Sequence, residues 1–507
     1  MARAPVTDPA RLGRLRDDLA ASGYTVDGVN AAIGPVAAAA LHREQPLPAD
    51  LATQGSPDPV AVLVQCFALG RVVSRRDLDG ALASLTTDGA QALGLVDTDG
   101  DEVRAGCELR PYGDEERDWW VASDLSEVAL GGPLPEDHVL GIGPASTTVA
   151  SWTPRDRVGR ALDLGTGCGV QALHLASHSA RVTATDVSHR ALTFARFNAG
   201  LAGIELDLRH GDLFDPVTSE RFDLVVSNPP FVITPRAPGV PAYAYRDAGL
   251  VGDQVVERLV RSVGDHLETG GIALFIGNWE VRSGGTWRDR WTDWLAGTGL
   301  DAWVVQRDEQ DPAEYAELWA RDGGSRSGVA GFEHLYAAWL ADFAARDVER
   351  IGFGVVALQR PSMSRPSRPP WVDLTEATGP VATASGGAMG ATVSAGIRAR
   401  TWLAEADDAT VLDVAWRCAD DVTEERHTRP GDADPRVILL RQGRGLGRVV
   451  RLDTVGAALV SVCDGTLPAR AALTAIAGLL GTDTDTTVRQ AAALLRGLVA
   501  DGLLVSA

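Results

Sequence analysis

Lysine is absent from this chain. All 47 of its basic residues are arginine, and they stand against 68 carboxylates, which gives the 507 residues a formal net charge of −21. This balance excludes a broad basic surface of the kind that grips nucleic-acid phosphates, so only a local arginine patch could serve bare RNA or DNA. The abundance of alanine and glycine beside arginine is typical of a high-GC coding bias, and an arginine therefore need not mark a functional site.

Cysteines are few, and long apolar runs are missing. The five cysteines are scattered and include no C-x-x-C pair, which argues against a disulfide framework and against a zinc site. No apolar run approaches the roughly 18 residues that a membrane span needs, and no apolar signal core follows the first residues. We therefore expect a cytoplasmic protein with no membrane partner and no metal, of roughly three domains.

A glycine-rich loop follows one apolar strand. Residues 160–169 read Arg-Ala-Leu-Asp-Leu-Gly-Thr-Gly-Cys-Gly, and position 170 is Val. A dinucleotide-binding loop would have the spacing G-x-G-x-x-G, so this spacing disfavours NAD. Glycine lets the main chain turn tightly and approach a ligand, and a helix predicted from Val170 to about Ser177 would present N–H groups to a carboxylate.

A second apolar strand ends in an unusual turn. Residues 222–231 read Phe-Asp-Leu-Val-Val-Ser-Asn-Pro-Pro-Phe, and the two prolines forbid further strand pairing. The side-chain oxygen of Asn228 and the carbonyl of Pro229 can accept the two N–H bonds of an –NH₂ group, which favours the geometry in which a planar nitrogen is nucleophilic. Phe231 offers a face on which a flat amide or base can lie.

Together these segments resemble the class I S-adenosylmethionine-dependent methyltransferases, and within them the HemK-like glutamine methyltransferases and the base amino-methyltransferases. The resemblance covers roughly residues 145–360. It implies an α/β fold with a Rossmann-like seven-stranded sheet and S-adenosylmethionine as the cofactor. The catalytic residues that it implies are Asn228, Pro229, Pro230 and Phe231.

The cofactor site is assigned in the same way. The glycine loop would hold the carboxylate of the methionine part, and Asp163 would lie near its amino end. Asp186 ends a strand predicted over residues 180–186, where a carboxylate can accept both ribose hydroxyls. Asp212 would reach the adenine amino group, and Leu213 would supply a backbone contact. The implied cofactor-binding residues are Asp163, Gly165, Thr166, Gly167, Gly169, Asp186, Asp212, Leu213 and Asn228.

Three further side chains near the loop have a structural interpretation. Cys168 is expected to be a small filler and not a nucleophile. His174 and His178 have a metal-like spacing of four, but no third ligand is evident, and we interpret them as solvated helix residues.

We expect four parts along the chain. Residues 1–140 form a helical, winged-helix-like domain, residues 141–360 the methyltransferase domain, residues 361–385 a proline- and arginine-rich linker, and residues 386–507 a second winged-helix-like domain. Expected elements outside the central domain are a buried helix over 59–69, a helix capped by Ser74 with Asp77, strands near 102–109, 119–122, 437–440 and 448–452, and helices near 455–462, 468–480 and 486–501.

The region after the second strand is rich in tryptophan. Trp287, Trp291 and Trp294 have helical spacing, and we favour core packing over a stacking platform for substrate. Trp279, at the end of a predicted fifth strand, is the better substrate-side candidate because strand ends form the ligand crevice in such folds. Residues 348–358 resemble the terminal strand of the domain.

The sequence is compatible with more than one class of methyl acceptor. The HemK-like resemblance implies a glutamine amide in a translation release factor, but Phe231 stands where those enzymes usually have Tyr and suits the ribosomal-RNA or DNA guanine and adenine amino-methyltransferases equally. The net charge favours a protein acceptor over naked RNA. A third interpretation is a non-catalytic regulator whose winged helices bind nucleic acid and whose central domain senses S-adenosylmethionine. Its signature would be a broken motif at 228–231, whereas here the motif is whole.

Overall fold

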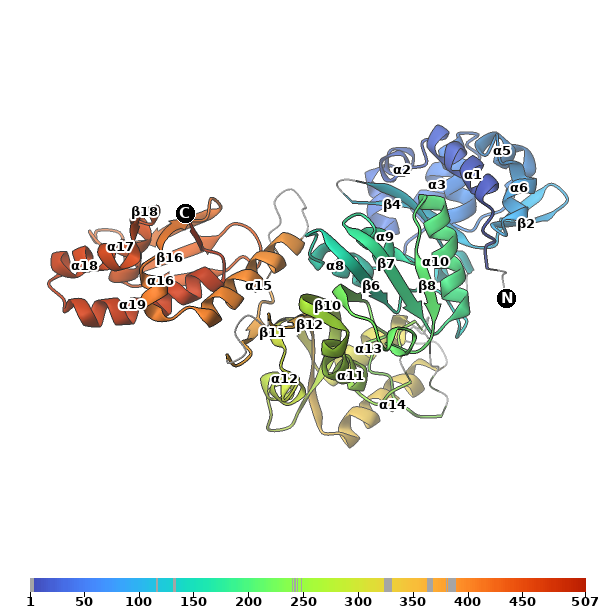
Figure 1. Ribbon diagram of the computed structural model, residues 1–507. Helices are drawn as coiled ribbons and strands as arrows, with labels where there is room; N and C mark the ends of the chain where they lie inside the picture. The colour runs from blue at the N-terminus through green and yellow to red at the C-terminus, as the bar shows by residue number, and fades with distance from the viewer. Residues whose placement is uncertain are drawn as a thin grey trace. The chain divides into compact units, whose positions relative to one another are not determined.

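The computed structural model (Figure 1) describes residues 4–114, 117–130, 134–238, 240, 243, 245–247, 249–322, 331–362, 368–379, 381 and 389–507. The chain divides into two compact units. The first comprises Met1–Ala150, Arg157–Thr298 and Asp308–Val355, and the second comprises Ser151–Asp156, Gly299–Arg307 and Val356–Ala507.

An eight-stranded sheet has the order β13-β11-β12-β10-β9-β6-β7-β8. Its strands are β6 (Val158–Leu164), β7 (Ser179–Asp186), β8 (Asp207–His210), β9 (Phe222–Ser227), β10 (Leu267–Arg282), β11 (Asp301–Gln310), β12 (Val348–Gln359) and β13 (Val372–Glu376). Strands β6 and β9 are buried over most of their length, which explains why both read as continuous apolar runs in the sequence.

The order of the strands places a topological switch point beside β6. The chain runs from β6 through β7 to β8 on one side and then returns to β9 on the other side. The pairs β6–β7, β7–β8, β6–β9 and β9–β10 are all parallel, so their carboxyl ends lie at one edge. In open α/β sheets this edge, at the switch point, is where ligands bind.

The sheet has one strand more than the seven expected. The eighth, β13, lies inside the segment predicted as a linker and pairs in parallel with β11 from Ala302↔Val372 to Gln306↔Glu376. Pro369 and Pro370 immediately precede it, and the run Val-Asp-Leu-Thr-Glu that follows them alternates apolar or β-branched with acidic residues, as an edge strand does. The linker prediction is therefore wrong for these five residues.

Helices cover the strands of the sheet: α8 (Pro144–Trp152), α9 (Val170–Leu175), α10 (His189–Ala202), α11 (Gln254–Ser262), α12 (Trp287–Leu295), α13 (Pro312–Asp322) and α14 (Phe332–Ala345). Helix α10 begins where the Ser188 side chain accepts a hydrogen bond from the Ala191 N–H and ends at Gly203, which has φ 71°. Short 3₁₀ turns cover Asp215–Val217 and Val263–His266.

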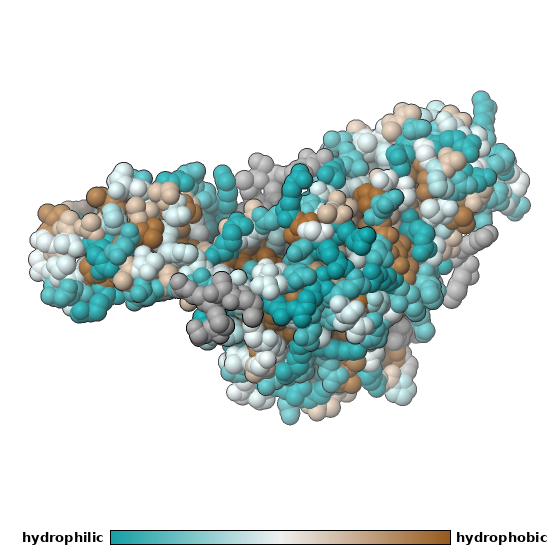
Figure 2. All heavy atoms as spheres, viewed as in Figure 1, coloured by the Kyte–Doolittle hydropathy of each residue, from teal (hydrophilic) through white to brown (hydrophobic). Residues whose placement is uncertain are grey.

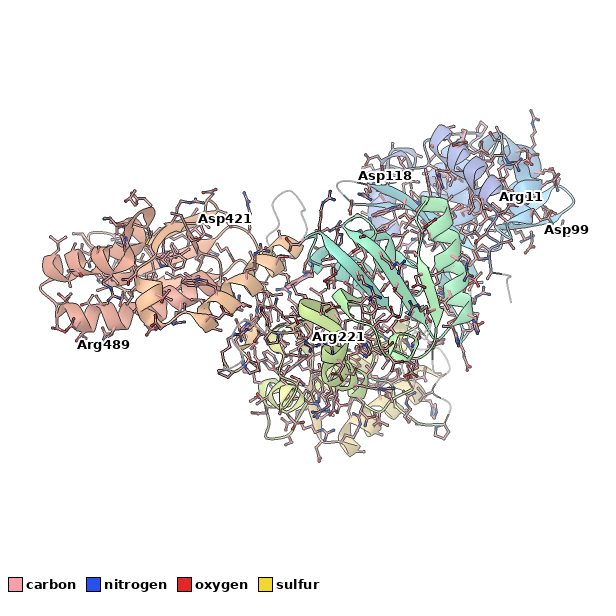
Figure 3. All side chains as sticks on the ribbon, in the orientation of Figure 1. Arg11, Asp99, Asp118, Arg221, Asp421 and Arg489 are labelled. Carbon is pink, nitrogen blue, oxygen red and sulfur yellow. The ribbon has the colours of Figure 1, made fainter. Side chains whose placement is uncertain are left out.

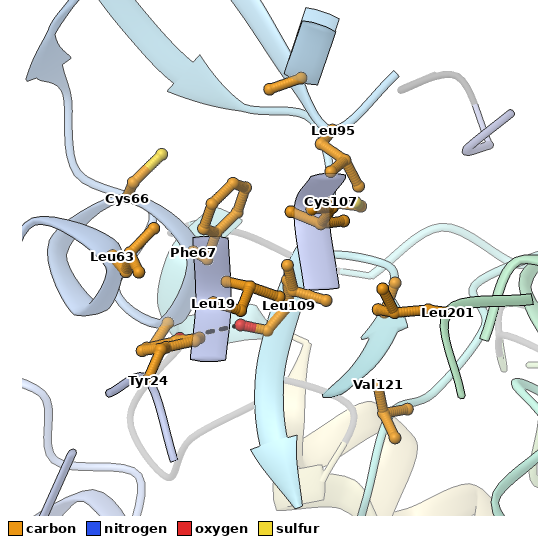
Figure 4. Packing of buried hydrophobic residues seen from close by; sticks show 14 of the residues in the cluster. Leu19, Tyr24, Leu63, Cys66, Phe67, Leu95, Cys107, Leu109, Val121 and Leu201 are labelled. Carbon is orange, nitrogen blue, oxygen red and sulfur yellow. Dashed lines mark hydrogen bonds between the residues drawn. The ribbon is translucent and has the colours of Figure 1, made fainter. Parts of the chain in front are cut away.

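The N-terminal elements share one hydrophobic core with α10. Figure 4 shows part of this core, in which Leu19, Phe67 and Leu109 gather around Tyr24, whose hydroxyl donates to the Leu109 carbonyl at 2.9 Å. The elements are α1 (Pro9–Ala21), α2 (Val26–Leu41), α3 (Leu47–Thr53), α4 (Pro59–Leu63), a π-helical turn (Val64–Ala68), β1 (Val73–Ser74), α5 (Arg75–Ala81), α6 (Thr86–Ala92), β2 (Val96–Asp99), β3 (Glu102–Ala105), β4 (Glu108–Gly113), β5 (Asp118–Ser123) and α7 (Glu127–Leu130).

The C-terminal part of the second unit has its own core and two small sheets, β15-β16-β17 and β18-β14-β19. Its elements are α15 (Gly390–Glu405), α16 (Asp408–Leu412), β14 (Ala415–Cys418), β15 (Val422–His427), β16 (Val437–Gln442), β17 (Val449–Leu452), α17 (Thr454–Ser461), β18 (Asp464–Pro468), α18 (Ala469–Leu480), α19 (Thr484–Ala500) and β19 (Leu504–Ser506). The predicted strands and helices of this region are confirmed to within about two residues.

In the part of the chain that the structure describes, no helix is both long and apolar enough to cross a bilayer. On the face drawn in Figure 2, hydrophilic residues predominate and hydrophobic ones lie between them in small groups.

One buried amide joins the N-terminal elements to the glycine loop. The Asn198 side chain on α10 accepts from the Ala122 N–H and donates to the Ala122 and Cys168 carbonyls, each at 2.8 Å. Ala122 belongs to β5, and Cys168 lies between β6 and α9. Asn198 therefore satisfies three backbone groups that would otherwise be buried without partners.

We expect Asn198→Ala to lower the free energy of unfolding by about 2–4 kcal/mol, because three buried backbone groups lose their partners. Asn30→Ala, at an exposed position of α2, is the matched control and should change stability by no more than about 0.5 kcal/mol. Chemical denaturation measures both. Equal effects of the two substitutions would contradict this role of Asn198.

Candidate active site

The carboxyl ends of β6, β7 and β9 bring three predicted segments together. Leu164 is in register with Thr185 of β7 and with Ser227 of β9. The glycine loop that follows Leu164, Asp186 and Asn228 therefore start at the same level of the sheet. Residues that the sequence separates by more than sixty positions meet here because the strands are parallel and adjacent.

The three loop glycines adopt conformations that side chains disfavour. Gly165, Gly167 and Gly169 have φ angles of 72°, 54° and 95°. A Cβ atom at Gly165 or Gly167 would meet no other atom within 4 Å, whereas one at Gly169 would lie 3.3 Å from Cα and Cβ of Ala195 on α10. The first two glycines thus border open space that a ligand can fill, and the third allows α10 to pack closely.

Asp163 lies fully buried beneath this loop. Its Oδ2 accepts from the Thr166 hydroxyl at 2.6 Å and from the Ala172 N–H at 2.9 Å. Its Oδ1 is buried and has no partner within the described residues. Burial raises the pKa of the Asp163 carboxyl to about 7, although the hydrogen bonds from Thr166 and Ala172 oppose this shift.

Asp186 forms a second anchor of the loop. Its carboxylate accepts from the Gly167 N–H at 2.9 Å and from the Ser188 N–H at 2.8 Å. Burial raises the pKa of Asp186, and the same two hydrogen bonds act against the shift. Each oxygen accepts one of these bonds and keeps further acceptor capacity, so the carboxylate can also bind the hydroxyls of a ligand.

Asn228 presents an unused acceptor. Its Nδ2 donates to the Ser146 hydroxyl at 3.4 Å, while its buried Oδ1 has no partner among the described residues. Ser146 belongs to α8, and its carbonyl accepts from the Gln171 Nε2 at 2.8 Å. The contact between Ser146 and Asn228 places the segment before β6 against the end of β9.

Aromatic residues from later in the chain support the turn at residues 228–231. Phe231 is 8% exposed and lies 6.3 Å from Trp319 and 5.7 Å from Phe353 between ring centroids. The Tyr315 hydroxyl accepts from the Ile233 N–H at 2.9 Å and from the Asn278 side chain at 2.6 Å.

Trp339 makes a similar contact, because its indole N–H donates to the Ile233 carbonyl at 2.9 Å. Tyr315, Asn278 and Trp339 are not among the site residues predicted from the sequence, although the helical spacing of the aromatic residues around Tyr315 and Trp339 is a signal for them.

The predicted adenine-side residues lie on the turn after β8. Asp212 is half exposed and lies 3.1 Å from Arg258 in an ion pair. Leu213 has a φ of 43°, which is uncommon for a residue with a side chain.

Two interpretations near the site are wrong. Trp279 does not face a substrate, because β10 continues to Arg282 and buries this ring against Trp287 and Trp291. His174 is not solvated, because its ring lies 2.7 Å from the Tyr112 hydroxyl and 3.2 Å from the Asp114 carboxylate. Among the described residues no group of three or more His, Cys, Asp or Glu is placed to hold a metal.

Two other interpretations are confirmed. Cys168 is buried and belongs to the hydrophobic core that α10 shares with the N-terminal elements, and this burial raises the pKa of its thiol to about 12. Trp287, Trp291 and Trp294 are core residues, as their spacing indicated.

Comparison with known proteins places these features in context. The methyltransferase small domain family matches residues 141–284. Two further families, both described as domains of unknown function, match residues 21–106 and 395–506.

Three relatives illustrate the similarity. A ribosomal protein uL3 glutamine methyltransferase of Bradyrhizobium diazoefficiens is 37% identical over 158 residues, which cover 29% of this chain and 48% of that protein. A ribosomal RNA small subunit methyltransferase C of an Enterobacter species is 31% identical over 173 residues, covering 33% and 45%. A release factor glutamine methyltransferase of Enterococcus faecalis is 45% identical over 73 residues, covering 14% and 26%.

The match thus spans at most about half the length of these relatives. Among solved structures, a T. thermophilus 16S rRNA methyltransferase in complex with AdoMet and guanosine is 15% identical, covers 46% of this chain and 60% of its own, and has a TM-score of 0.27.

The loop glycines should differ in what they tolerate. Gly169→Ala combines a left-handed backbone with a tight contact to Ala195, and we expect it to cost about 2–3 kcal/mol of stability. A Cβ at Gly167 would lie in open space. Gly167→Ala should therefore lower the free energy of unfolding only by the cost of a left-handed backbone for alanine, about 1 kcal/mol. Thermal and chemical denaturation compare the two variants. A larger loss for Gly167→Ala would show that the loop has a different conformation.

Proposed function

We propose that the central part of this chain is a class I S-adenosylmethionine-dependent methyltransferase domain, and that the protein transfers a methyl group to a planar nitrogen, with a protein glutamine side-chain amide as the acceptor. The observation that carries this proposal is the buried Oδ1 of Asn228, which has no partner within the described residues at the switch point of the sheet. A buried acceptor left unpaired costs free energy, so its retention points to a ligand that supplies the missing N–H.

The residues around the glycine loop fit the cofactor. S-adenosylmethionine supplies an electrophilic methyl group on a sulfonium. Asp163 Oδ1, buried and unpaired within the described part of the chain, can accept from the ligand's ammonium group. Asp186 can accept from the ribose hydroxyls, and the open space beside Gly165 and Gly167 lets the backbone approach the ligand. Thr166, Gly169, Asp212 and Leu213 complete the proposed cofactor-binding set.

Asn228 acts on the acceptor. An amide nitrogen is a poor nucleophile because its lone pair is delocalised, and the methyl transfer is an in-line displacement that depends on positioning. Acceptance of one N–H by Asn228 Oδ1 and of the other by the Pro229 carbonyl would fix the direction of the nitrogen lone pair. Ser146 holds the Asn228 side chain on its Nδ2 side and so leaves Oδ1 directed to the acceptor.

Phe231 and Pro230 complete the proposed acceptor side. The rings of Trp319 and Phe353 restrict the orientation of the Phe231 ring. The part of this ring that is exposed can therefore offer a fixed face to a flat amide or base. Both acceptor classes can use this arrangement, and the names of the relatives include glutamine and ribosomal-RNA methyltransferases.

The charge favours the protein acceptor. A net charge of −21 repels naked RNA over long range, whereas a protein can present a neutral or basic surface. The relatives act, by their names, on ribosomal components or a release factor, and the proposed reaction accordingly takes place in the cytoplasm. Ribosomal RNA is the second candidate because the name of one relative refers to it.

The proposal places the catalytic domain between two flanking regions. In this proposal residues 141–360 are the catalytic domain, and residues 1–140 and 386–507 are separate domains on either side of it in the sequence. The exposed residues of α19 include Arg489 (Figure 3), but few other basic residues accompany it. This composition favours protein contact over DNA binding for the C-terminal part.

Substitution of Asn228 should separate chemistry from cofactor binding. We expect Asn228→Ala to lower kcat on the order of 10²- to 10³-fold, the usual loss for one preorganised polar contact, and to change the Kd for S-adenosylhomocysteine by no more than about twofold. Asn228→Asp should lose less activity because an acceptor oxygen remains. Calorimetry and turnover assays measure the two quantities. A loss of cofactor binding in Asn228→Ala would assign the residue to the loop structure instead.

Labelling identifies the acceptor. A lysate from a deletion strain, incubated with the purified protein and tritiated S-adenosylmethionine, should incorporate label into a protein band that protease removes. Asn228→Ala protein is the matched control and should give little label. Label that survives protease and disappears with ribonuclease would move the enzyme to the ribosomal-RNA amino-methyltransferases. No label in either fraction would contradict the proposed activity.

A further inference from the structure

A large cavity lies in the second unit. The residues that line it are far in sequence from every residue of the proposed active site. The volume of the cavity is about 800 Å³, and α15, β14, the loop after β16 and the chain from the end of α19 into β19 form its walls.

Most of the lining is apolar. Ala391, Ala395 and Ala399 follow one another at intervals of four along one face of α15, which gives the cavity a flat wall of methyl groups. Trp402 continues this face and is 36% exposed. Its ring meets that of Trp416 edge to face, with 5.7 Å between centroids. An exposed tryptophan beside a wall of small residues provides a large apolar contact surface for a ligand.

The polar groups gather at one side, around the turn after β16. The side-chain amide of Gln442 already has a partner within the protein, because its Nε2 donates to the Asp501 carbonyl at 2.8 Å. Arg398 pairs with Asp156 at 3.5 Å in an exposed contact. Across the residues that the structure describes, the Arg444 guanidinium makes no hydrogen bond or ion pair, and it is exposed. Asp421, on the neighbouring turn (Figure 3), contributes one carboxylate to this side.

The cavity is an open cleft, since Ala391, Ala395, Arg398 and Arg444 in its lining are exposed. Small-molecule sites are typically apolar clefts of about 300–1,000 Å³ with a few polar groups, and the volume of this cleft, about 800 Å³, falls in that range. The wall is also specifically built: a Cβ at Gly445 would come within 3.1 Å of the Thr392 side chain, so glycine lets the turn that carries Arg444 lie against α15.

The charge of this region differs from that of the chain as a whole. Residues 389–507 contain 13 arginines and 15 carboxylates, so they carry only a small part of the net charge of −21. A small anion that approaches this region meets little of the repulsion that the rest of the chain would exert.

We propose that this cavity binds a small amphipathic anion. The apolar body of the ligand lies against Ala395, Ala399 and Trp402, and its carboxylate or phosphate accepts hydrogen bonds from Arg444. The site is independent of the methyl-transfer reaction, since none of its lining residues belongs to the proposed active site.

A matched series of probes tests the proposal on the full-length protein. Octanoate, octan-1-ol and octylammonium share one apolar body and differ in the head group. We expect octanoate to bind at least tenfold more tightly than octylammonium, with octan-1-ol between them. Calorimetry gives the three dissociation constants. Equal or tighter binding of octylammonium, or no saturable binding of octanoate, would overturn the proposal.

Two variants with controls locate the site. Arg444→Gln should weaken octanoate binding about tenfold, as the loss of one charge-assisted contact does, and should leave octan-1-ol unchanged. Arg489→Gln, an exposed arginine of α19 outside the lining, is its control and should change neither. Ala395→Leu projects an isobutyl group from α15 into the cavity and should weaken binding of all three probes, whereas Ala493→Leu, at an exposed position of α19, should not. Unchanged octanoate binding in Ala395→Leu with native circular dichroism would show that the probe binds elsewhere.

Discussion

The turn from β6 into α9 depends on one buried carboxylate. Asp163 accepts from the Thr166 hydroxyl and from the Ala172 N–H, and so holds both ends of the glycine loop. Without an acceptor at this point, the Ala172 N–H in the first turn of α9 and the buried Thr166 hydroxyl would lack a partner. Asp186 and Asn198 add further bonds, to the Gly167 N–H and the Cys168 carbonyl. The loop is therefore fixed from three sides, and only its open side, beside Gly165 and Gly167, is left for a ligand.

This arrangement explains why two buried oxygens at the site have no partner within the described residues. Asp163 Oδ1 and Asn228 Oδ1 belong to side chains whose other atoms are already bonded, so neither can turn to find a partner without the loss of an existing bond. Under the proposed function, the first atom serves the cofactor and the second serves the acceptor. The cost of their burial is then offset when the ligands bind, which is how preorganised sites favour the bound state.

The parts of the site that are local in sequence could be predicted, and the long-range contacts could not. The glycine spacing, the acid at the end of β7 and the turn at residues 228–231 each follow a strand directly, so apolar patterning was enough to place them. Ser146 contacts Asn228 from 82 residues away, and Tyr315 contacts Ile233 from the same separation. Such contacts depend on how helices pack, which periodicity does not specify.

The prediction for His174 was wrong for the same reason, since its partners Tyr112 and Asp114 come from the hairpin of β4 and β5. The wrong predictions for Trp279 and β13 have another cause. The extent of a strand depends on which strands pair with it in the sheet, and the sequence pattern does not specify this pairing.

The proton balance of cofactor binding reports on the role of Asp163. With a pKa of about 7, Asp163 is roughly half protonated at pH 7, and the ammonium group of S-adenosylhomocysteine favours the carboxylate form. Calorimetry in buffers of different ionisation enthalpy should therefore show release of about half a proton at pH 7, with an affinity that rises as the pH approaches 7 from below and levels off above it. Asp163→Asn, of the same shape, should bind with no such release. A proton balance that is zero in the native protein, or unchanged in Asp163→Asn, would contradict the claim that this oxygen is reserved for the cofactor.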